Sequence, residues 1–182
     1  RPIQAGCLEC HATYVELRQP PNSFTPSSLI PGISCERCHG PGREHVDFHA
    51  ANPESKKPQF ITVPSKLPRQ QEMDVCGQCH TASKAPKQEK AFQFRPGDSL
   101  EDHFDRLEGF DESANSVHTS NQIARLELSE CFKQSEMACV ECHNPHRNER
   151  GQMALFSKRC LNCHAEGHCG MSEQLGQRLS DN

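Results

Sequence analysis

The stretch Cys35-Glu36-Arg37-Cys38-His39 has two cysteines three positions apart and a histidine directly after the second. Five copies of this C-x-x-C-H pattern occur, and they begin at Cys7, Cys35, Cys76, Cys139 and Cys160. Their second cysteines, each followed by the histidine of the copy, are Cys10-His11, Cys38-His39, Cys79-His80, Cys142-His143 and Cys163-His164. Cysteines at this spacing reach both vinyl groups of haem c as thioethers, and the next histidine becomes the proximal iron ligand. The pattern therefore predicts five covalently bound haems.

Zinc binding, thioredoxin-like redox chemistry and disulfide bonding are the other common uses of cysteine pairs. The pairs Cys139/Cys142 and Cys160/Cys163 are separated by 17 residues, which also fits a four-cysteine zinc site. A zinc site or a redox motif does not require a histidine after every second cysteine, yet all five pairs have one. Disulfides alone leave the same histidines unexplained. We therefore favour haem attachment.

The apolar composition is too low for an ordinary core. Leu, Ile, Val and Phe account for 32 of the 182 residues, about 18%, whereas chains below roughly 20% usually fail to bury enough apolar surface to fold. Five haems would supply the missing apolar mass, and folding should then depend on their attachment.

Charge and hydropathy exclude several classes of function. A net charge of −4 and a pI near 6.3 give no electrostatic reason to expect nucleic-acid binding. No apolar run is long enough to span a membrane, and the first residues do not resemble a signal peptide. Because thioethers form outside the cytoplasm, we expect an exported chain in the periplasm or outside the cell.

The expected fold is mainly α with much irregular structure and little or no sheet, in a single pentahaem domain over residues 1–182. The first cysteines of successive motifs are 28, 41, 63 and 21 residues apart, which is too irregular for a solenoid. Periodicity and capping signals predict helices, and β-branched residues predict one strand. The helices are expected at 119–133, from Ser135 into the fourth motif, at 172–179 and near 100–107, and the strand at 60–63.

Two long connections are expected between the motifs. Residues 52–72 contain Pro53, Pro58, Pro64 and Pro68 and are expected to run extended over the surface. Residues 81–117 are expected to form a loop insertion.

Six histidines remain as candidate distal ligands for five haems: His45, His49, His103, His118, His146 and His168. His45 follows the stiff turn Gly40-Pro41-Gly42, and His146 follows Pro145. His118 directly precedes the expected helix at 119–133. The other three have charged, flexible surroundings that suit a solvated histidine equally well. The six candidates outnumber the five distal positions, so every haem could have two histidine ligands. The four methionines are interpreted as packing residues.

Three stretches resemble a known family: residues 32–42 with His45, Ser129-Glu130-Cys131-Phe132 with Ser135, and Cys142-His143-Asn144-Pro145-His146. They are similar to multihaem c-type cytochromes related to the tetrahaem electron acceptors of ammonia oxidisers, above all to larger versions, some with tetratricopeptide repeats. The resemblance covers about residues 5–170. It implies bis-histidine haems in stacked and angled pairs, with His45, His118 and His146 at distal positions. Relatives often continue beyond both ends, which is compatible with this chain being a segment of a longer one.

Two function classes remain, an electron-transfer cytochrome and a reductase or dehydrogenase of a small nitrogen or sulfur compound with one open haem. The six histidines outside the motifs are enough to fill the distal position of all five haems. This favours electron transfer, since a haem with both axial positions filled exchanges electrons without binding substrate. No motif has lysine in place of the proximal histidine, as pentahaem nitrite reductases would require. Tyr14 is the single tyrosine, which leaves little room for the tyrosine-crosslinked haem of hydroxylamine oxidoreductases.

Two further expectations concern the remaining cysteines and the partners. Cys131 and Cys169 lie outside the motifs, and we expect a disulfide between them, with two buried free thiols as the alternative. Residues 56–95 carry a net charge of +5, and residues 98–112 carry −6. Either both segments are solvated surface, or they dock redox partners or further copies of the chain, which could build an oligomer or a filament.

Overall fold

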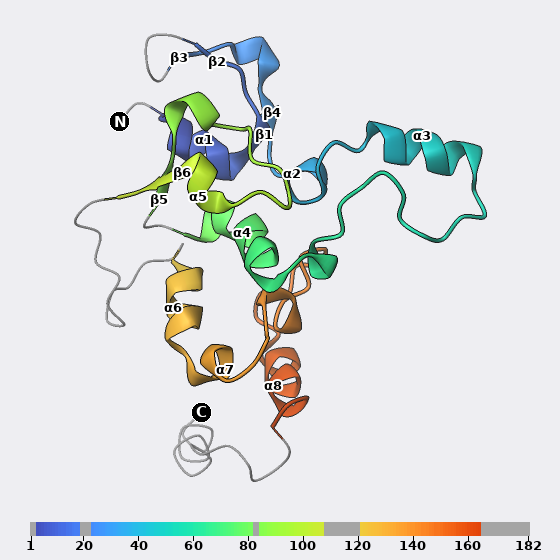
Figure 1. Cartoon of the computed structure of the whole chain (residues 1–182), viewed down its shortest axis with the longest axis vertical. Coiled ribbons are helices and arrows are strands. Elements are labelled where there is room, and N and C mark those ends of the chain that lie inside the picture. Colours follow the sequence, from blue (N-terminus) through green and yellow to red (C-terminus); the bar gives the residue numbers. More distant parts are fainter. Residues whose placement is uncertain (1–2, 19–22, 82–83, 108–120, 165–182) are drawn as a thin grey trace. The chain divides into compact units, whose positions relative to one another are not determined.

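The structure, a computed structural model, describes residues 3–18, 23–81, 84–107 and 121–164 (Figure 1). The chain forms two compact units, a first unit of Arg1–Met137 and a second unit of Ala138–Asn182. Helices and irregular segments predominate in the described ranges, and the sheets there are small, which confirms the expected fold class.

Helices carry most of the regular structure. The α-helices are α1 (Ala5–His11), α2 (Glu36–His39), α3 (Arg43–Ala51), α4 (Arg69–His80), α5 (Leu100–His103), α6 (Gln122–Leu128), α7 (Glu130–Lys133) and α8 (Met153–Leu161). The 3-10 helices are η1 (Pro26–Ser28), η2 (Pro64–Lys66), η3 (Gln88–Lys90) and η4 (Cys139–Glu141). Antiparallel pairs join β1 (Ala12–Tyr14) to β4 (Ile30–Pro31), β2 (Leu17–Arg18) to β3 (Ser23–Phe24), and β5 (Lys84–Pro86) to β6 (Phe104–Arg106).

Helix α4 is the centre of the first unit and contacts α1, α5 and α6. Its buried residue Val75 packs with Phe94, Leu100 and Phe104 in one apolar cluster. The carboxylate of Asp74 accepts a hydrogen bond of 3.2 Å from the backbone N–H of Leu100, which begins α5. A side chain of α4 thus satisfies a free donor at the start of the neighbouring helix.

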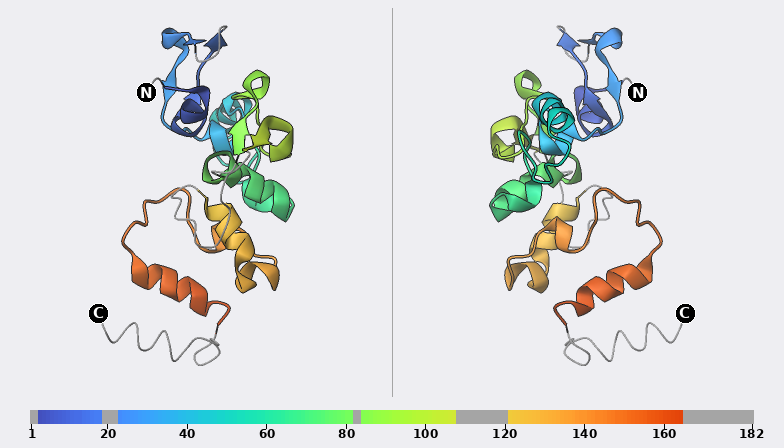
Figure 2. Two further views of the ribbon diagram at one scale, coloured as in Figure 1. Left: turned by 90° about the vertical axis from the view of Figure 1, so that its left-hand side faces the viewer. Right: turned by 90° about the vertical axis from the view of Figure 1, so that its right-hand side faces the viewer.

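A second small apolar cluster lies under the β-ribbons and consists of Ala12, Val15 and Phe92, with Leu17 and Phe24 packed against it. Figures 1 and 2 show the β2–β3 ribbon beyond α1, on the side away from α4. Among the described residues of the first unit, the apolar core is therefore divided into two small clusters, in line with the low content of large apolar residues.

The Pro-rich segment ends earlier than predicted. Residues 52–63 have no helix or strand, but η2 follows at Pro64 and α4 begins at Arg69. Pro68 is the N-cap residue of α4, so this proline starts a helix instead of extending the surface segment. The expected strand at 60–63 was wrong, because Phe60 has a φ of 55° and packs its ring against Phe48.

Residues 84–106 are not a simple loop. They contain β5, η3, α5 and β6, and they contribute the buried residues Phe92, Phe94, Leu100 and Phe104. The prediction of a loop insertion overlooked four large apolar residues spread over 13 positions without a helical or strand period. The expected helix near 100–107 ends at His103, where the chain continues directly into β6.

The helix expected at 119–133 is interrupted at Ser129. This residue has an extended backbone, and its hydroxyl accepts a hydrogen bond of 3.2 Å from the N–H of Phe132. Ser129 thereby caps α7, and α6 ends one residue before it. Helix α6 begins after Asn121, and Thr119, expected as the cap, lies outside the described residues.

Arg69 ties α7 to the start of α4. Its guanidinium donates to the carbonyl oxygens of Phe132 at 2.7 Å and Met137 at 2.9 Å, and it lies 3.7 Å from the centre of the Phe132 ring. The helix expected from Ser135 into the fourth motif was wrong. The Ser135 hydroxyl donates to the carbonyl of Cys131, closing the preceding turn, and only the 3-10 turn η4 follows. The helix expected at 172–179 lies outside the described residues.

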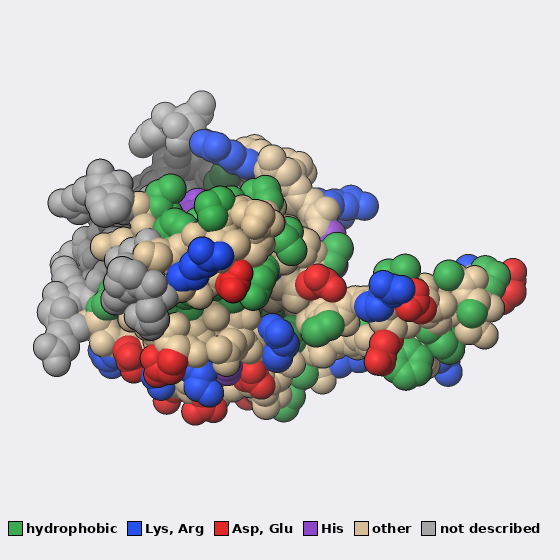
Figure 3. Space-filling model, turned by 90° about the horizontal axis from the view of Figure 1, so that it is seen from above, with side chains coloured by type: hydrophobic (Ala, Val, Ile, Leu, Met, Phe, Trp, Pro, Cys, Tyr) green, Lys and Arg blue, Asp and Glu red, His purple; other side chains and the backbone are tan. Residues whose placement is uncertain are grey.

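Helix α3 and the segment after it project from the rest of the first unit (Figures 1 and 3). Charged and hydrophobic side chains alternate over this projection in Figure 3, and Arg43 pairs with Asp47 at 2.9 Å on its surface. Val46 is 62% exposed. None of the described helices is long and apolar enough to cross a membrane.

Gly77 of the third motif should not tolerate a side chain. A Cβ atom there would lie 2.7 Å from Cδ2 of the buried Leu100 and 3.2 Å from Cδ1 of Ile123. We expect Gly77→Ala to lower the free energy of unfolding by about 1–3 kcal/mol, because overpacking outweighs the helix propensity of alanine. Denaturant titration of the haem-loaded protein measures this change.

Gly6→Ala in α1 is the matched control. A Cβ atom at this position meets its nearest neighbour, Cδ of Pro86, at an ordinary 3.7 Å. We expect it to raise the free energy of unfolding by about 0.5 kcal/mol. Equal effects of the two substitutions would contradict the packing of Gly77 against Leu100.

Candidate haem-attachment sites

Each C-x-x-C-H motif forms a single helical turn. The histidine N–H donates to the carbonyl of the first cysteine at 2.9 Å in the second motif and at 3.0 Å in the fourth and fifth motifs. The first and third motifs are the last turns of α1 and α4. Residues three and four positions apart lie on one face of a helix. Both cysteines and the histidine of each motif therefore share a face, as attachment to one haem requires.

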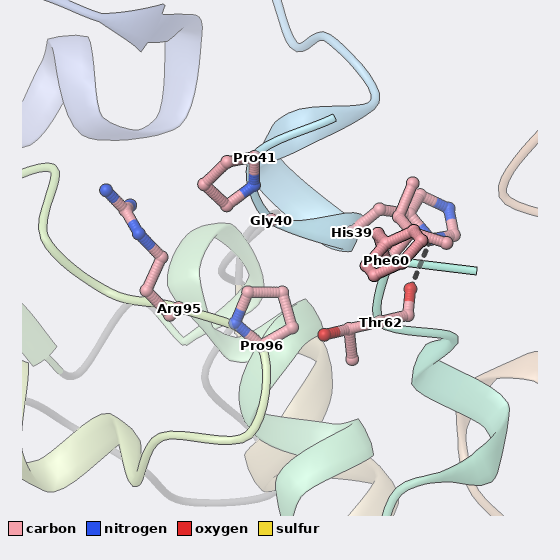
Figure 4. Close-up of a pocket in the computed structure, with 8 residues that line it drawn as sticks. His39, Gly40, Pro41, Phe60, Thr62, Arg95 and Pro96 are labelled. Atoms are coloured by element: carbon pink, nitrogen blue, oxygen red, sulfur yellow. Dashed lines mark hydrogen bonds between the residues drawn. The ribbon is translucent and has the colours of Figure 1, made fainter. Parts of the chain in front are cut away.

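His39, a predicted proximal ligand, is held in the orientation that an iron ligand needs. Its Nδ1 lies 2.8 Å from the carbonyl oxygen of Thr62 (Figure 4). A carbonyl can only accept, so Nδ1 carries the proton and Nε2 keeps its lone pair for a metal. Beside it lies a cavity of about 490 Å³, lined in part by Phe60, Arg95 and Pro96.

Two more histidines have the same arrangement. Nδ1 of the proximal His80 lies 3.1 Å from Oε1 of Gln122 in α6. Nδ1 of His45, a distal candidate in α3, lies 2.7 Å from the carbonyl of Gln59. In both, the hydrogen bond leaves Nε2 available for iron. Sequence reasoning could not find these acceptors, because they come from segments 14 and 42 residues away.

His49 and His103 have different surroundings. His49 is one turn after His45, the two ring centroids are 4.6 Å apart, and its Nε2 is buried with no hydrogen-bond partner in the described part of the chain. His103 is 8% exposed, its Nε2 is 3.1 Å from the carboxylate of Asp98, and its ring packs against Phe94. This environment favours a packing role for His103.

The remaining distal candidates are less well defined. His146 is exposed, and its N–H donates to Oδ1 of Asn144 at 3.0 Å, which fixes the turn at Pro145. His118 and His168 lie outside the described residues, as does Cys169. The thiol of Cys131 is exposed and unbridged in the structure, and its predicted pairing with Cys169 stays a prediction.

Apolar side chains beside the second motif fit a haem. Tyr14, Ile30 and Ile33 are 44%, 49% and 50% exposed. Tyr14 and Ile30 line a second cavity of about 200 Å³, together with Glu36 of the motif and Arg95. Exposed apolar groups of this size favour an apolar partner, and an arginine suits the carboxylates at the edge of a haem. The residues present therefore fit haem c at this motif.

The first and third motifs lie side by side. Before haem is attached, the thiols of Cys10 and Cys79 share a hydrogen bond, and Sγ of Cys10 also contacts the backbone carbonyl of Gln78 at 3.6 Å. The hydrogen bond from Cys79 lowers the pKa of Cys10 to about 7. Donating that bond, together with burial, raises the pKa of Cys79 well above its ordinary value. Two haem-attachment points thus meet in one place.

Within the described ranges, no three or more side chains of His, Cys, Asp and Glu come together to hold a metal ion directly. These ranges include the four cysteines of the fourth and fifth motifs, whose spacing resembles that of a zinc site.

In the second unit an ion pair joins the fourth and fifth motifs. Arg159, directly before Cys160, donates to both carboxylate oxygens of Glu149 at 2.6 and 2.7 Å and to the carbonyl of Cys142 at 2.8 Å. The N–H of Asn144 completes the contact with Glu149 at 3.1 Å. Sequence reasoning missed this pair. Its one signal was an arginine directly before a motif cysteine.

Two comparisons of the sequence with known proteins agree with haem attachment. The family described as cytochrome c554 and c-prime matches residues 2–40, which contain the first two motifs. The multiheme cytochrome MtrA of Shewanella baltica (strain OS185) is 24% identical over 191 aligned positions, covering 88% of this chain and 52% of the relative. The chain therefore spans about half the length of this relative.

Among solved structures, the outer cell wall cytochrome OcwA is 21% identical, with a TM-score of 0.43 over 81% of this chain and 34% of that chain. The sequence similarities support a multihaem c-type cytochrome. They do not single out the tetrahaem electron acceptors of ammonia oxidisers, to which the motifs show a resemblance.

The Glu149–Arg159 pair should make the second unit sensitive to acid. The hydrogen bonds from Arg159 hold the pKa of Glu149 at about 2, below its ordinary value of 4.5. The ionised carboxylate then stabilises the fold fully above about pH 5, and this contribution is lost as the pH falls from 4.5 towards 2. Thermal unfolding between pH 2 and 7 measures the loss.

Glu149→Gln should lower the unfolding temperature at pH 7 and flatten its acid dependence. Glu136→Gln, at an exposed side chain, is the matched control and should behave as the parent protein. An unchanged acid dependence in Glu149→Gln would show that the ion pair does not carry the effect.

Proposed function

We propose that this chain is a multihaem c-type cytochrome that carries electrons along five haems. The observation that carries the proposal is the single helical turn of each motif, which presents two cysteines and a histidine on one face. Each haem would supply an iron that alternates between its ferrous and ferric states. The chain would fix the haems by thioethers and hold the proximal histidines with Nε2 towards the metal.

The distal ligands are proposed to be histidines on all five haems. His45 has the best support, because the carbonyl of Gln59 fixes its tautomer and orientation. His146, His118 and two of His49, His103 and His168 would complete the set, with His103 the least suited because Asp98 occupies its Nε2. Two histidine ligands fill both axial positions, which favours electron transfer over binding of a small substrate.

The proposed location is the periplasm or the cell exterior, where thioethers form. The proposed partners are redox proteins or further copies of the chain. Part of the segregated charge is neutralised within the chain, because Lys84 lies 3.7 Å from Glu101 and Lys87 lies 3.9 Å from Asp105. Charges outside the β5–β6 ribbon, such as the exposed Lys56, Lys57 and Lys90, are left to steer a partner or to build an oligomer or filament.

Association through these charges should depend on salt. Screening acts within about 8–10 Å at physiological ionic strength, so sedimentation should show larger species at low salt and smaller ones at high salt. Interprotein electron transfer should slow over the same range. If the protein stays monomeric at low salt and its electron-transfer rate does not change with salt concentration, partners or further copies do not dock through these charges.

The haem-loaded protein should have five covalent haems by intact mass and only low-spin ferric signals in low-temperature electron paramagnetic resonance (EPR). His45→Ala should convert one haem to a high-spin form that binds carbon monoxide when reduced, because one axial position becomes open. Val46→Ala, at an exposed side chain of the same helix, is the matched control and should leave every haem low-spin. A substantial high-spin signal in the unaltered protein would overturn the assignment of two histidines to every haem.

A further inference from the structure

The residue directly before the second cysteine is buried in each of the first three motifs. These residues are Glu9, Arg37 and Gln78, and they are 1%, 7% and 4% exposed. Charged side chains are rarely buried to this extent unless they are paired. We call these three residues the motif cluster.

Glu9 and Arg37 join the first motif to the second. Nη2 of Arg37 lies 3.0 Å from Oε1 of Glu9 and 2.9 Å from the carbonyl oxygen of the same residue. The other carboxylate oxygen of Glu9 accepts from the N–H of Phe92 at 2.9 Å, and the guanidinium of Arg37 lies 5.5 Å from the centre of the Phe92 ring. Both charges are thus paired and hydrogen-bonded out of water.

Gln78 joins the third motif to the other two. Its Nε2 donates to the backbone carbonyl of Arg37 at 3.2 Å, and its backbone carbonyl oxygen lies 3.6 Å from Sγ of Cys10. The sulfur atoms of Cys10 and Cys79, which lose their S–H protons when thioethers form, are also neighbours. Each of the three motifs therefore contacts both of the others through this position or through the neighbouring cysteine.

Burial at this position is not a general property of the motif. In the fourth motif the corresponding residue is Glu141, which is exposed and accepts from the N–H of Ala138 in its own turn. In the fifth motif it is Asn162, which is also exposed. The cluster is therefore specific to the three motifs of the first unit.

A buried ion pair is a weak source of stability, because the loss of hydration offsets most of the attraction between the charges. Its better-supported effect is to select one arrangement, since any other leaves a charge unpaired in a dry interior. Electron transfer between cofactors depends steeply on the distance between them. A cluster that selects one arrangement of three attachment turns would therefore act directly on that distance.

We propose that Glu9, Arg37 and Gln78 are positioning residues that fix the first three haem-attachment sites relative to one another for electron transfer between their haems. This inference rests on the proposed function, because it assumes that these three motifs carry haem. It adds that three side chains which bind no haem iron determine how the haems are placed relative to one another.

The test compares Arg37→Gln, Arg37→Lys and the double variant Glu9→Gln/Arg37→Gln in the haem-loaded full chain. Intact mass first establishes that each variant has the same number of haems as the parent. Two properties are then measured, the coupling between haems, by EPR and by the splitting of the Soret band in circular dichroism, and the reduction potentials. Glu141→Gln, at the same motif position outside the cluster, is the matched control.

We expect the coupling signals to be altered or lost in Arg37→Gln and in the double variant and unchanged in Glu141→Gln. The reduction potentials of the haems distinguish the effect of a changed side-chain charge from the effect of a changed haem position. Arg37→Gln removes one positive charge beside the haems, which stabilises ferric haem and lowers the potentials, whereas the double variant removes one charge of each sign and should restore them. Arg37→Lys keeps the charge but not the planar guanidinium, so the coupling should change while the potentials stay near those of the parent.

Parent-like coupling in Arg37→Gln and in the double variant would overturn the proposal, even if both variants unfold at lower temperature. If Arg37→Gln fails to take up haem, Gln78→Ala is tested instead by the same coupling signals. This substitution removes one uncharged hydrogen bond of the cluster, and parent-like coupling in it would then overturn the proposal. Failure of the proposed function would appear in the unaltered protein, as missing haems or high-spin signals, and is therefore distinguishable from failure of the cluster.

Discussion

The hydrogen bond from the histidine N–H to the carbonyl of the first cysteine closes the second, fourth and fifth attachment motifs into one helical turn. In the first and third motifs the same turn is the end of a longer helix. The rest of the structure depends on this turn, because only a helical spacing brings two sulfur atoms and an imidazole to one face. The connections between the turns can then vary widely in length. The connections set where the turns lie, and for His39 and His80 they also supply the hydrogen-bond acceptor of Nδ1.

Contacts between turns are electrostatic in both units. Glu9 and Arg37 join the first two motifs, and Glu149 and Arg159 join the last two. A chain with small apolar clusters cannot fix such short elements by packing alone, whereas a hydrogen-bonded ion pair has one favoured geometry. The bidentate pair Glu149–Arg159 also binds the carbonyl of Cys142, so the constraint reaches the attachment turn itself. In each pair at least one charged residue is directly next to a motif cysteine: Glu9 and Arg37 in the first unit and Arg159 in the second.

The class of fold could be predicted from the sequence, because it depends on local spacing and composition. The attachment cysteines and proximal histidines come from the same local spacing and stay predictions. The sequence did not predict the core role of Phe92 and Phe94, which lie in a segment without periodicity, or the break at Ser129, where a side-chain hydrogen bond competes with the helix. The acceptors of His45 and His80 and the burial of Glu9 and Arg37 depend on contacts between distant segments. No pattern within one motif contains that information, although the opposite charges at equivalent positions of the first two motifs were visible.

Around the second motif the usual distribution of side chains is reversed. Glu9, Arg37 and Gln78 are buried between the attachment turns, while Tyr14, Ile30 and Ile33 are about half exposed. In an ordinary domain this arrangement would cost hydration on the inside and leave apolar surface in water on the outside. It suits a chain that receives its apolar mass as covalently attached haem, because haems can cover the outer side chains while the polar contacts hold the turns from within. Folding of the first unit is then coupled to haem attachment, and the polar contacts decide which arrangement the haems stabilise.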